Sequence, residues 1–124
     1  MDDAPLNDAP LAELVGVSVD CTDPQLLASF YEALSGLERT YETADIVVLG
    51  AGPVRLGFQR VEDHQPPTWP GSGKQLHLDF AVTDLDRAER EVLRRGGVKP
   101  HTQPGGDRWQ VYLDPAGHPF CLST

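Results

Sequence analysis

Apolar and polar residues alternate along two stretches of the chain that are separated by 61 positions. The first stretch covers residues 15–23 and the second residues 76–84, and each ends in Thr-Asp before a helical pattern begins. Alternation with a period of two is typical of a strand that buries one face. Two strand–helix units at a fixed offset indicate an internal repeat.

The helical patterns that follow have clear ends. Asp23 suits the N-cap, Pro24 the first helical position, and Gly36 a left-handed C-terminal cap. The second helix begins at or just after Asp84. Each helix carries a stripe of apolar residues, namely Leu26, Leu27, Phe30, Tyr31 and Leu34 in the first, and Leu85, Ala88, Val92 and Leu93 in the second. Because Gly36 matches Gly97 under the same offset, we expect helices of equal length.

Short strands are predicted after each helix. They cover residues 46–49 and 54–60 in the first half and 109–113 and 119–123 in the second, with one further weak strand per half near 37–41 and 98–102. Turns rich in glycine and proline join the strands of each pair. Each half therefore has the predicted order β-α-β-β-β, and the fold class is α+β.

These elements predict one domain over residues 13–124. Module one covers residues 13–61, a linker rich in proline and glycine covers residues 62–74, and module two covers residues 75–124. Residues 1–12 carry three acidic residues, no basic residue and no periodicity, so we expect a flexible acidic arm there. Neither module can bury its sheet alone, so we expect both to fold as one unit.

Strand parity assigns the two faces of each predicted strand. Apolar side chains face the helices at Val15, Val17, Val19, Leu56, Phe58, Leu76, Leu78, Phe80, Val82, Phe120 and Leu122. The opposite faces are small or polar. A sheet that curves around them encloses a cleft suited to a ligand. The candidate ligand-binding residues on these faces are Ser18, Asp20, Gln59, His77, Asp79 and Cys121.

Charge and composition limit the kinds of partner that we expect the protein to bind. Ten Lys and Arg residues against nineteen Asp and Glu residues give a net charge of -9, which argues against binding to nucleic acid or to anionic membranes. No apolar run approaches the length of a membrane span, and the first residues are acidic where a secretory leader is basic. Two cysteines 100 positions apart form no disulfide framework, so we expect a cytoplasmic protein.

Several short motifs resemble one known superfamily. They are Thr22-Asp23-Pro24, Phe30-Tyr31, Leu34-Ser35-Gly36-Leu37, residues 76–80, residues 83–86 and residues 114–122. In this order and spacing, the chain resembles the vicinal oxygen chelate superfamily of glyoxalase I, bleomycin-resistance proteins and extradiol dioxygenases. It is most similar to small bacterial glyoxalase-like domain proteins. The resemblance implies two βαβββ modules that form a curved mixed sheet around a cleft, often within a homodimer.

The resemblance also implies a divalent metal held by His, Gln and Glu side chains. The corresponding positions of this chain are Gly16, His77 and Cys121, with the remaining ligand at Gly57 or Gln59. Gly16 has no side chain to offer, so we favour no metal or other cofactor. If a divalent metal binds instead, the resemblance implies that its ligands are His77, Cys121 and Gln59.

A different donor set is also chemically acceptable for zinc, namely His77, Asp79 and Cys121. Residues two apart on one strand splay along it, so we expect His77 and Asp79 to share an ion only if the strand is distorted.

Two functions remain open after these considerations. We favour a glyoxalase-like protein that binds a small molecule in its cleft without the standard metal site. The alternative is an isomerase, lyase or dioxygenase of the same superfamily, with His77 as its catalytic base, since imidazole titrates near neutrality. A nucleophilic Cys121 needs a lowered pKa, and burial is the commoner fate of cysteine.

Other residues with useful chemistry lie outside the predicted strands. We expect the loop residues His64, His101 and His118 to face solvent, and we expect Trp69 in the linker to serve as a lid or a dimer contact.

Overall fold

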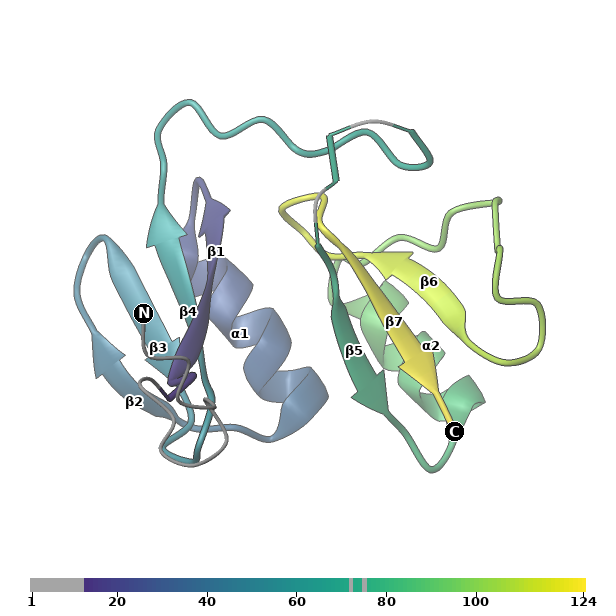
Figure 1. Cartoon of the computed structure of the whole chain (residues 1–124), viewed down its shortest axis with the longest axis horizontal. Helices are drawn as coiled ribbons and strands as arrows, with labels where there is room; N and C mark the ends of the chain where they lie inside the picture. Colours follow the sequence, from purple (N-terminus) through teal and green to yellow (C-terminus); the bar gives the residue numbers. More distant parts are fainter. Residues whose placement is uncertain (1–12, 72, 75) are drawn as a thin grey trace, which may run out of the picture.

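The computed structural model describes residues 13–71, 73–74 and 76–124, so the arm expected at residues 1–12 lies outside the described residues. Two halves succeed each other along the chain (Figure 1). The first comprises β1 (Gly16–Cys21), α1 (Pro24–Ser35), β2 (Arg39–Glu42), β3 (Ile46–Leu49) and β4 (Arg55–Arg60). The second comprises β5 (Leu78–Ala81), α2 (Leu85–Arg94), β6 (Gln110–Leu113) and β7 (Pro119–Ser123).

The strands form two small mixed sheets with related topologies. The order is β1-β4-β3-β2 in the first sheet and β5-β7-β6 in the second. The outer strand β1 runs parallel to β4, just as β5 runs parallel to β7, whereas the other pairs are antiparallel. This arrangement confirms both the α+β class and the repeat.

The second sheet differs from the first at its far edge. Residues 98–102, which the structure describes throughout, form an isolated bridge between Val98 and Leu113, so the strand expected there is wrong. The side chain of Gln103 takes its place along β6. Its Nε2 donates to the carbonyl of Val111 at 2.9 Å, and its Oε1 accepts from the amide N–H of Val111 at 2.8 Å. One side-chain amide thus supplies the pairing that a neighbouring strand would supply.

Both helices begin as the sequence predicts. The carboxylates of Asp23 and Asp84 accept hydrogen bonds from the amides of Leu26 and Arg87, and α1 ends at Gly36 with a φ of 73°. The helices are not of equal length, because α1 has 12 residues and α2 has 10.

The shorter second helix follows from the chain reversal behind it. The amide of Gly97 donates to the carbonyl of Val92, and a Cβ at Gly97 would lie 2.5 Å from Val92 Cγ1. The chain therefore turns back onto the last turn of the helix, at a distance that only glycine fits.

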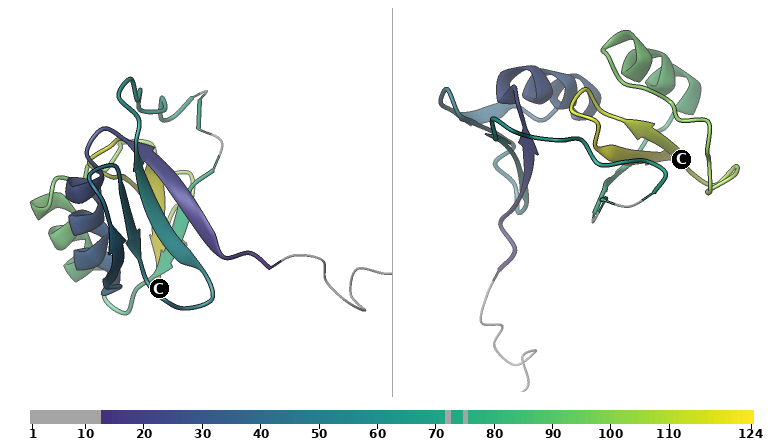
Figure 2. Two further views of the ribbon diagram at one scale, coloured as in Figure 1. Left: turned by 90° about the vertical axis from the view of Figure 1, so that its left-hand side faces the viewer. Right: turned by 90° about the horizontal axis from the view of Figure 1, so that it is seen from above.

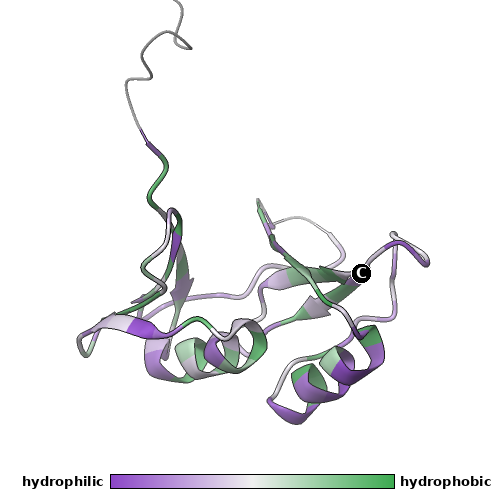
Figure 3. Cartoon of the chain, turned by 90° about the horizontal axis from the view of Figure 1, so that it is seen from below, coloured by the Kyte–Doolittle hydropathy of each residue, from purple (hydrophilic) through white to green (hydrophobic). Residues whose placement is uncertain are grey.

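The helices cover the same side of both sheets (Figure 2). Their hydrophobic sides face the strands and their hydrophilic sides face outward (Figure 3). Four residues expected in the core are instead exposed, namely Val15, Leu26, Leu76 and Leu93. Val15 and Leu76 precede β1 and β5, while Leu26 and Leu93 lie at the margins of their helical stripes, so neither pair reaches the helix–sheet interface.

The core is continuous across the two halves. Tyr31 of α1 stacks on Phe58 of β4 at 5.4 Å between ring centroids and on Phe80 of β5 at 5.9 Å. Its ring also meets the edge of Phe120 in β7 at 5.8 Å. One side chain of module one therefore packs against rings of both modules, at the join between the two modules.

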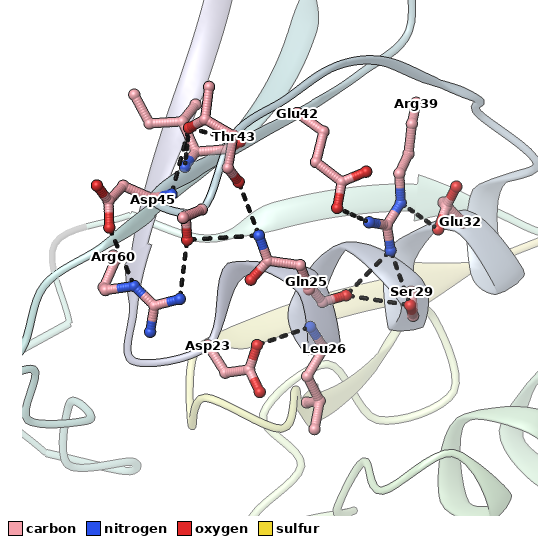
Figure 4. Close-up of polar contacts among 12 residues, drawn as sticks. Asp23, Gln25, Leu26, Ser29, Glu32, Arg39, Glu42, Thr43, Asp45 and Arg60 are labelled. Carbon is pink, nitrogen blue, oxygen red and sulfur yellow. Dashed lines mark hydrogen bonds and ion pairs between the residues drawn. The ribbon is translucent and has the colours of Figure 1, made fainter.

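Polar contacts fix the edge of the first sheet to α1 (Figure 4). The guanidinium of Arg39 in β2 donates to Glu32 in the helix and to Glu42 in its own strand, both at 2.9 Å. Arg60, at the end of β4, donates to Asp45 at 3.2 Å before β3. These links hold the strands that support β1, whose outer edge borders the candidate site.

Among the helices of the described residues, none combines the length and the apolar character needed to cross a membrane.

Candidate functional site

A cavity of about 580 Å³ lies between β1 of module one and the start of β5 in module two. Ser18 and Asp20 line it from β1, and His77 lines it from the segment before β5. Val19 and Leu78, which strand parity assigns to the helix-facing side, also line it. The linker closes it with residues 64–68 and with Lys74. The cavity is therefore shared by the two modules and lies beside the strands that the repeat places at the join.

The turn between β6 and β7 forms one wall of the cavity around Asp114. This carboxylate is buried, and its Oδ1 accepts from the amides of Ala116 at 2.9 Å and His118 at 3.0 Å. Its Oδ2 accepts from the hydroxyl of Tyr31 at 2.7 Å. Burial raises the pKa of Asp114 despite these bonds, and burial and the neighbouring Asp114 raise the pKa of Tyr31. The pair is a rigid support between α1 and the turn.

Two histidines that we expected to face solvent also line this cavity. The Nε2 of His118 lies 2.6 Å from the carbonyl of Asp20, and the Nε2 of His64 lies 3.2 Å from the carbonyl of Ala116. Their rings are 5.0 Å apart. A backbone carbonyl can only accept a hydrogen bond, so each Nε2 is the donor in its contact.

The linker brings these histidines together by packing on the β6–β7 turn. Gly117 has a φ of 89°, and a Cβ there would collide with Pro66. The glycine of the turn and the proline of the linker were visible in the sequence, but nothing in the pattern paired them. That missing long-range contact is why the sequence did not identify His64, His118 and Lys74 as site residues.

A second cavity of about 350 Å³ adjoins the first. Asp79 and Cys121 line it, together with Trp69 of the linker and Trp109 before β6. His77 and Lys74 border both cavities. The single cleft of the sequence prediction is thus divided, with Ser18 and Asp20 in one part and Asp79 and Cys121 in the other.

Three polar side chains of the second cavity lie together. His77 Nε2 is 3.2 Å from Asp79 Oδ1, and donor atoms of His77, Asp79 and Cys121 all lie within 4.8 Å of one another. Asp79 and Cys121 are direct partners in the parallel pairing of β5 with β7. His77 and Asp79 come close because β5 begins at Leu78, so His77 lies before the strand. This is a departure from regular strand geometry of the kind that we expected such a pair to need.

Neither cysteine is set up as a nucleophile. Burial, and then the negative charge of Asp79, raise the pKa of the Cys121 thiol. Burial raises the pKa of Cys21 to about 11. Both groups are therefore neutral thiols at pH 7, whereas nucleophilic catalysis requires a thiolate.

Comparison with known proteins identifies the family. The model of a family described as glyoxalase-like domain matches residues 16–123. The chain belongs to the glyoxalase-like domain family. Curated proteins give no match to the sequence. This family match agrees with the resemblance to the vicinal oxygen chelate superfamily. Solved structures that share the fold include proteins described as glyoxalase, bleomycin-resistance or dioxygenase family members.

Three of these structures show the extent of the likeness. A glyoxalase/bleomycin resistance protein/dioxygenase family enzyme from Burkholderia phytofirmans is 20% identical with a TM-score of 0.70, covering 90% of this chain and 97% of that one. A possible glyoxalase from Bacillus cereus is 14% identical, with a TM-score of 0.68 and the same coverages. A lactoylglutathione lyase from Agrobacterium tumefaciens is 20% identical, with a TM-score of 0.59 and coverages of 92% and 94%. At these identities the likeness establishes the shared fold.

The metal positions that the resemblance implies in module one provide no suitable ligand in this chain. Gly16 and Gly57 lie at two of them and have no side chain to offer, and a Cβ at either position would be in tight contact, 3.2 Å from Arg55 O and Ser18 Oγ respectively. Gln59 is exposed on β4 and does not line either of the two larger cavities formed by the described residues. β4 lies one strand farther from module two than β1 does, which explains why Gln59 misses the join.

Proposed function

We propose that this glyoxalase-like protein binds a small molecule in the cavity between β1 and β5. The single observation that carries this proposal is the cavity itself, at about 580 Å³, within the usual size of a ligand site. Polar groups converge on it from β1, from the start of β5, from the linker and from the β6–β7 turn. Apolar surface is supplied by Val19, Leu76, Leu78 and the linker prolines.

The charge of the lining differs from that of the whole chain. Lys74 and three histidines face the cavity with Asp20, while Asp114 is occupied by Tyr31 and two backbone amides. The net charge of -9 thus says little about the ligand. The lining suits a molecule with an anionic or acceptor group near Lys74 and a donor near Asp20 or Ser18.

A panel of aromatic compounds bearing a carboxylate or an amine tests the proposal. Compounds that raise the melting temperature are titrated into the protein by isothermal calorimetry. We expect binding to be lost in Ser18→Tyr, which fills the cavity from β1, and retained in Ala51→Tyr, an equal substitution in the exposed turn before β4. Equal affinity in both variants would contradict binding at this place, and turnover of a bound compound would contradict a purely binding role.

The enzyme alternative rests on the contact between His77 and Asp79. A carboxylate 3.2 Å from the imidazole orients a histidine as a general base, and His77 borders the ligand cavity. An isomerase, lyase or dioxygenase of the superfamily would then act through His77. His77→Ala should abolish turnover of any substrate found in the panel while leaving the fold intact, and unchanged turnover would eliminate this alternative.

The homodimer implied by the superfamily remains a prediction. Val15 and Val54 expose apolar side chains where the carbonyl of Val15 receives the amide of Arg55, at the start of the β1–β4 pair. A second copy of the chain that covers this surface would supply the burial that the monomer lacks.

A further inference from the structure

The cluster of His77, Asp79 and Cys121 in the second cavity has the composition of a metal site rather than of a ligand wall. An imidazole nitrogen, a carboxylate oxygen and a cysteine sulfur are the donor types that zinc binds in proteins. All three come from module two, whereas the superfamily draws its metal ligands from both modules. Two of the three, His77 and Cys121, fall on positions where the resemblance implies ligands. Asp79 is the donor that the resemblance does not imply, and it stands in for the ligands that module one lacks at Gly16 and Gly57.

The geometry of the cluster is close to that of an ion-bound set. Bond lengths to zinc of about 2.0–2.3 Å at tetrahedral angles place two donors on one ion about 3.3–3.8 Å apart. The nitrogen of His77 and the oxygen of Asp79 are 3.2 Å apart, and the sulfur of Cys121 completes a set within 4.8 Å. Small side-chain rotations bring these atoms to a common ion, since the register of β5 and β7 already places Asp79 beside Cys121.

The surroundings also allow an ion to reach the cluster. They keep one coordination position of that ion open. His77 and Asp79 are exposed, while Cys121 is buried at the base of the cavity. Lys74 also lines this cavity, and its side-chain ammonium lies over the ring of Trp69, 4.8 Å from the ring centroid. Asp79 and a Cys121 thiolate together would balance the two charges of the ion.

We propose that His77, Asp79 and Cys121 form a three-ligand site for zinc or a similar borderline-soft divalent ion in module two. The ion replaces the thiol proton of Cys121, which passes to solvent. The fourth position opens toward the second cavity, beside the larger cavity that His77 also borders. The site shares His77 with the larger cavity, whereas Asp79 and Cys121 line the second cavity, so variants of Asp79 and Cys121 test the ion separately from the small-molecule function.

Cobalt binding to the tag-free full chain tests this site directly. The protein is freed of metal with a chelator, the chelator is removed, and Co²⁺ is added while the absorption spectrum is recorded. We expect one Co²⁺ per chain, a thiolate-to-cobalt charge-transfer band in the near ultraviolet, intense visible bands of a tetrahedral ion, and loss of all of them when Zn²⁺ is added.

Variants assign the ligands. Cys121→Ser should lose the charge-transfer band, and Asp79→Asn should weaken Co²⁺ binding by more than about tenfold, since even outer partners of a ligand are worth about 10–100-fold. Cys21→Ser is the matched control and should keep the band, because Cys21 points to the carbonyl of Gln59 in module one. Asp79→Asn changes an exposed side chain, so circular dichroism should show an unchanged fold.

The opposite results would overturn the site. They are the absence of a charge-transfer band in the unaltered chain, a band that survives Cys121→Ser, and a band that disappears in Cys21→Ser. Unchanged Co²⁺ affinity in a folded Asp79→Asn protein would remove the carboxylate from the ligand set and with it the proposal.

Discussion

At the scale of single residues, the contact between Tyr31 and Asp114 stabilises one wall of the larger cavity. The hydroxyl donates to a buried carboxylate at 2.7 Å, across 83 positions of sequence, and joins α1 to the turn that carries His118. Removing a donor from a buried charged acceptor is costly, because water cannot replace it. The stability of the cavity wall is therefore tied to one hydrogen bond between the modules.

Tyr31→Phe should lower the free energy of unfolding by about 1–3 kcal/mol, since Oδ2 of Asp114 then loses its donor while the ring packing remains. Urea denaturation measures the change. Tyr41→Phe, at an exposed residue of β2, is the control and should stay within about 0.5 kcal/mol of the unaltered protein. Similar values for both variants would show that the buried bond contributes little.

The raised pKa of Asp114 gives the stability a predictable dependence on pH. A carboxyl whose folded-state pKa lies above its unfolded value contributes stability that is complete below the ordinary value of 3.8 and is lost as pH rises through the folded pKa. Tyr31 and His118 are the titratable groups that face it. The stability of the unaltered protein relative to Asp114→Asn should therefore fall with rising pH across this window. Urea unfolding of both proteins at several pH values checks this, and a difference that is constant or grows with pH would be contrary to it.

Residue-level chemistry was predictable where it depends on neighbours in the sequence. The caps at Asp23 and Asp84 and the cavity-facing side of Ser18 and Asp20 follow from local spacing. The placement of Gln59 outside the larger cavities, and of His118 inside one, depends on which strand lies at the join. Such long-range placement has no signal in a single sequence.

At the scale of elements, the edge of the second sheet shows a side chain replacing a strand. Apolar alternation predicted β3 and β7 with the bounds that the structure has, because their side chains are packed between helix and sheet. The pattern near residues 98–102 predicted a strand that the structure replaces with the amide of Gln103. A side-chain amide that takes the place of backbone hydrogen-bonding groups does not change the hydrophobic periodicity, so the pattern cannot predict it.

Gln103→Ala should destabilise the protein by about 1–3 kcal/mol, because both backbone groups of the buried Val111 lose their partner. Gln103→Glu keeps an acceptor for the amide of Val111 but has no donor for its carbonyl, so it should also destabilise. Thermal or urea unfolding measures these changes. The exposed neighbour Thr102→Ala should have little effect, and a Gln103→Ala protein as stable as this control would refute the role of the amide.

At the scale of the whole molecule, the two modules share one core and one candidate site. Rings from α1, β4, β5 and β7 meet at Tyr31, and the larger cavity is lined from both halves. The repeat was visible in the sequence at a fixed offset. The two adjoining cavities were not, because the linker residues that line both have no periodic pattern from which to place them.

Unfolding should therefore occur in a single transition. The two tryptophans, Trp69 and Trp109, report on the linker and module two, whereas circular dichroism reports on the helices and sheets of both modules. The urea midpoints from tryptophan fluorescence and from far-ultraviolet circular dichroism should coincide. Separate midpoints would mean that module two unfolds independently and that the core is not continuous.

The most direct test of the central claim is to locate a bound compound by nuclear magnetic resonance. The compound of the carboxylate and amine panel with the highest affinity is titrated into ¹⁵N-labelled protein, and the amide signals are followed. The account predicts that signals of Ser18, Asp20, His77 and His118 shift together and saturate at one equivalent. Shifts confined to other parts of the chain, or no shift of these four signals with any compound of the panel, would contradict it.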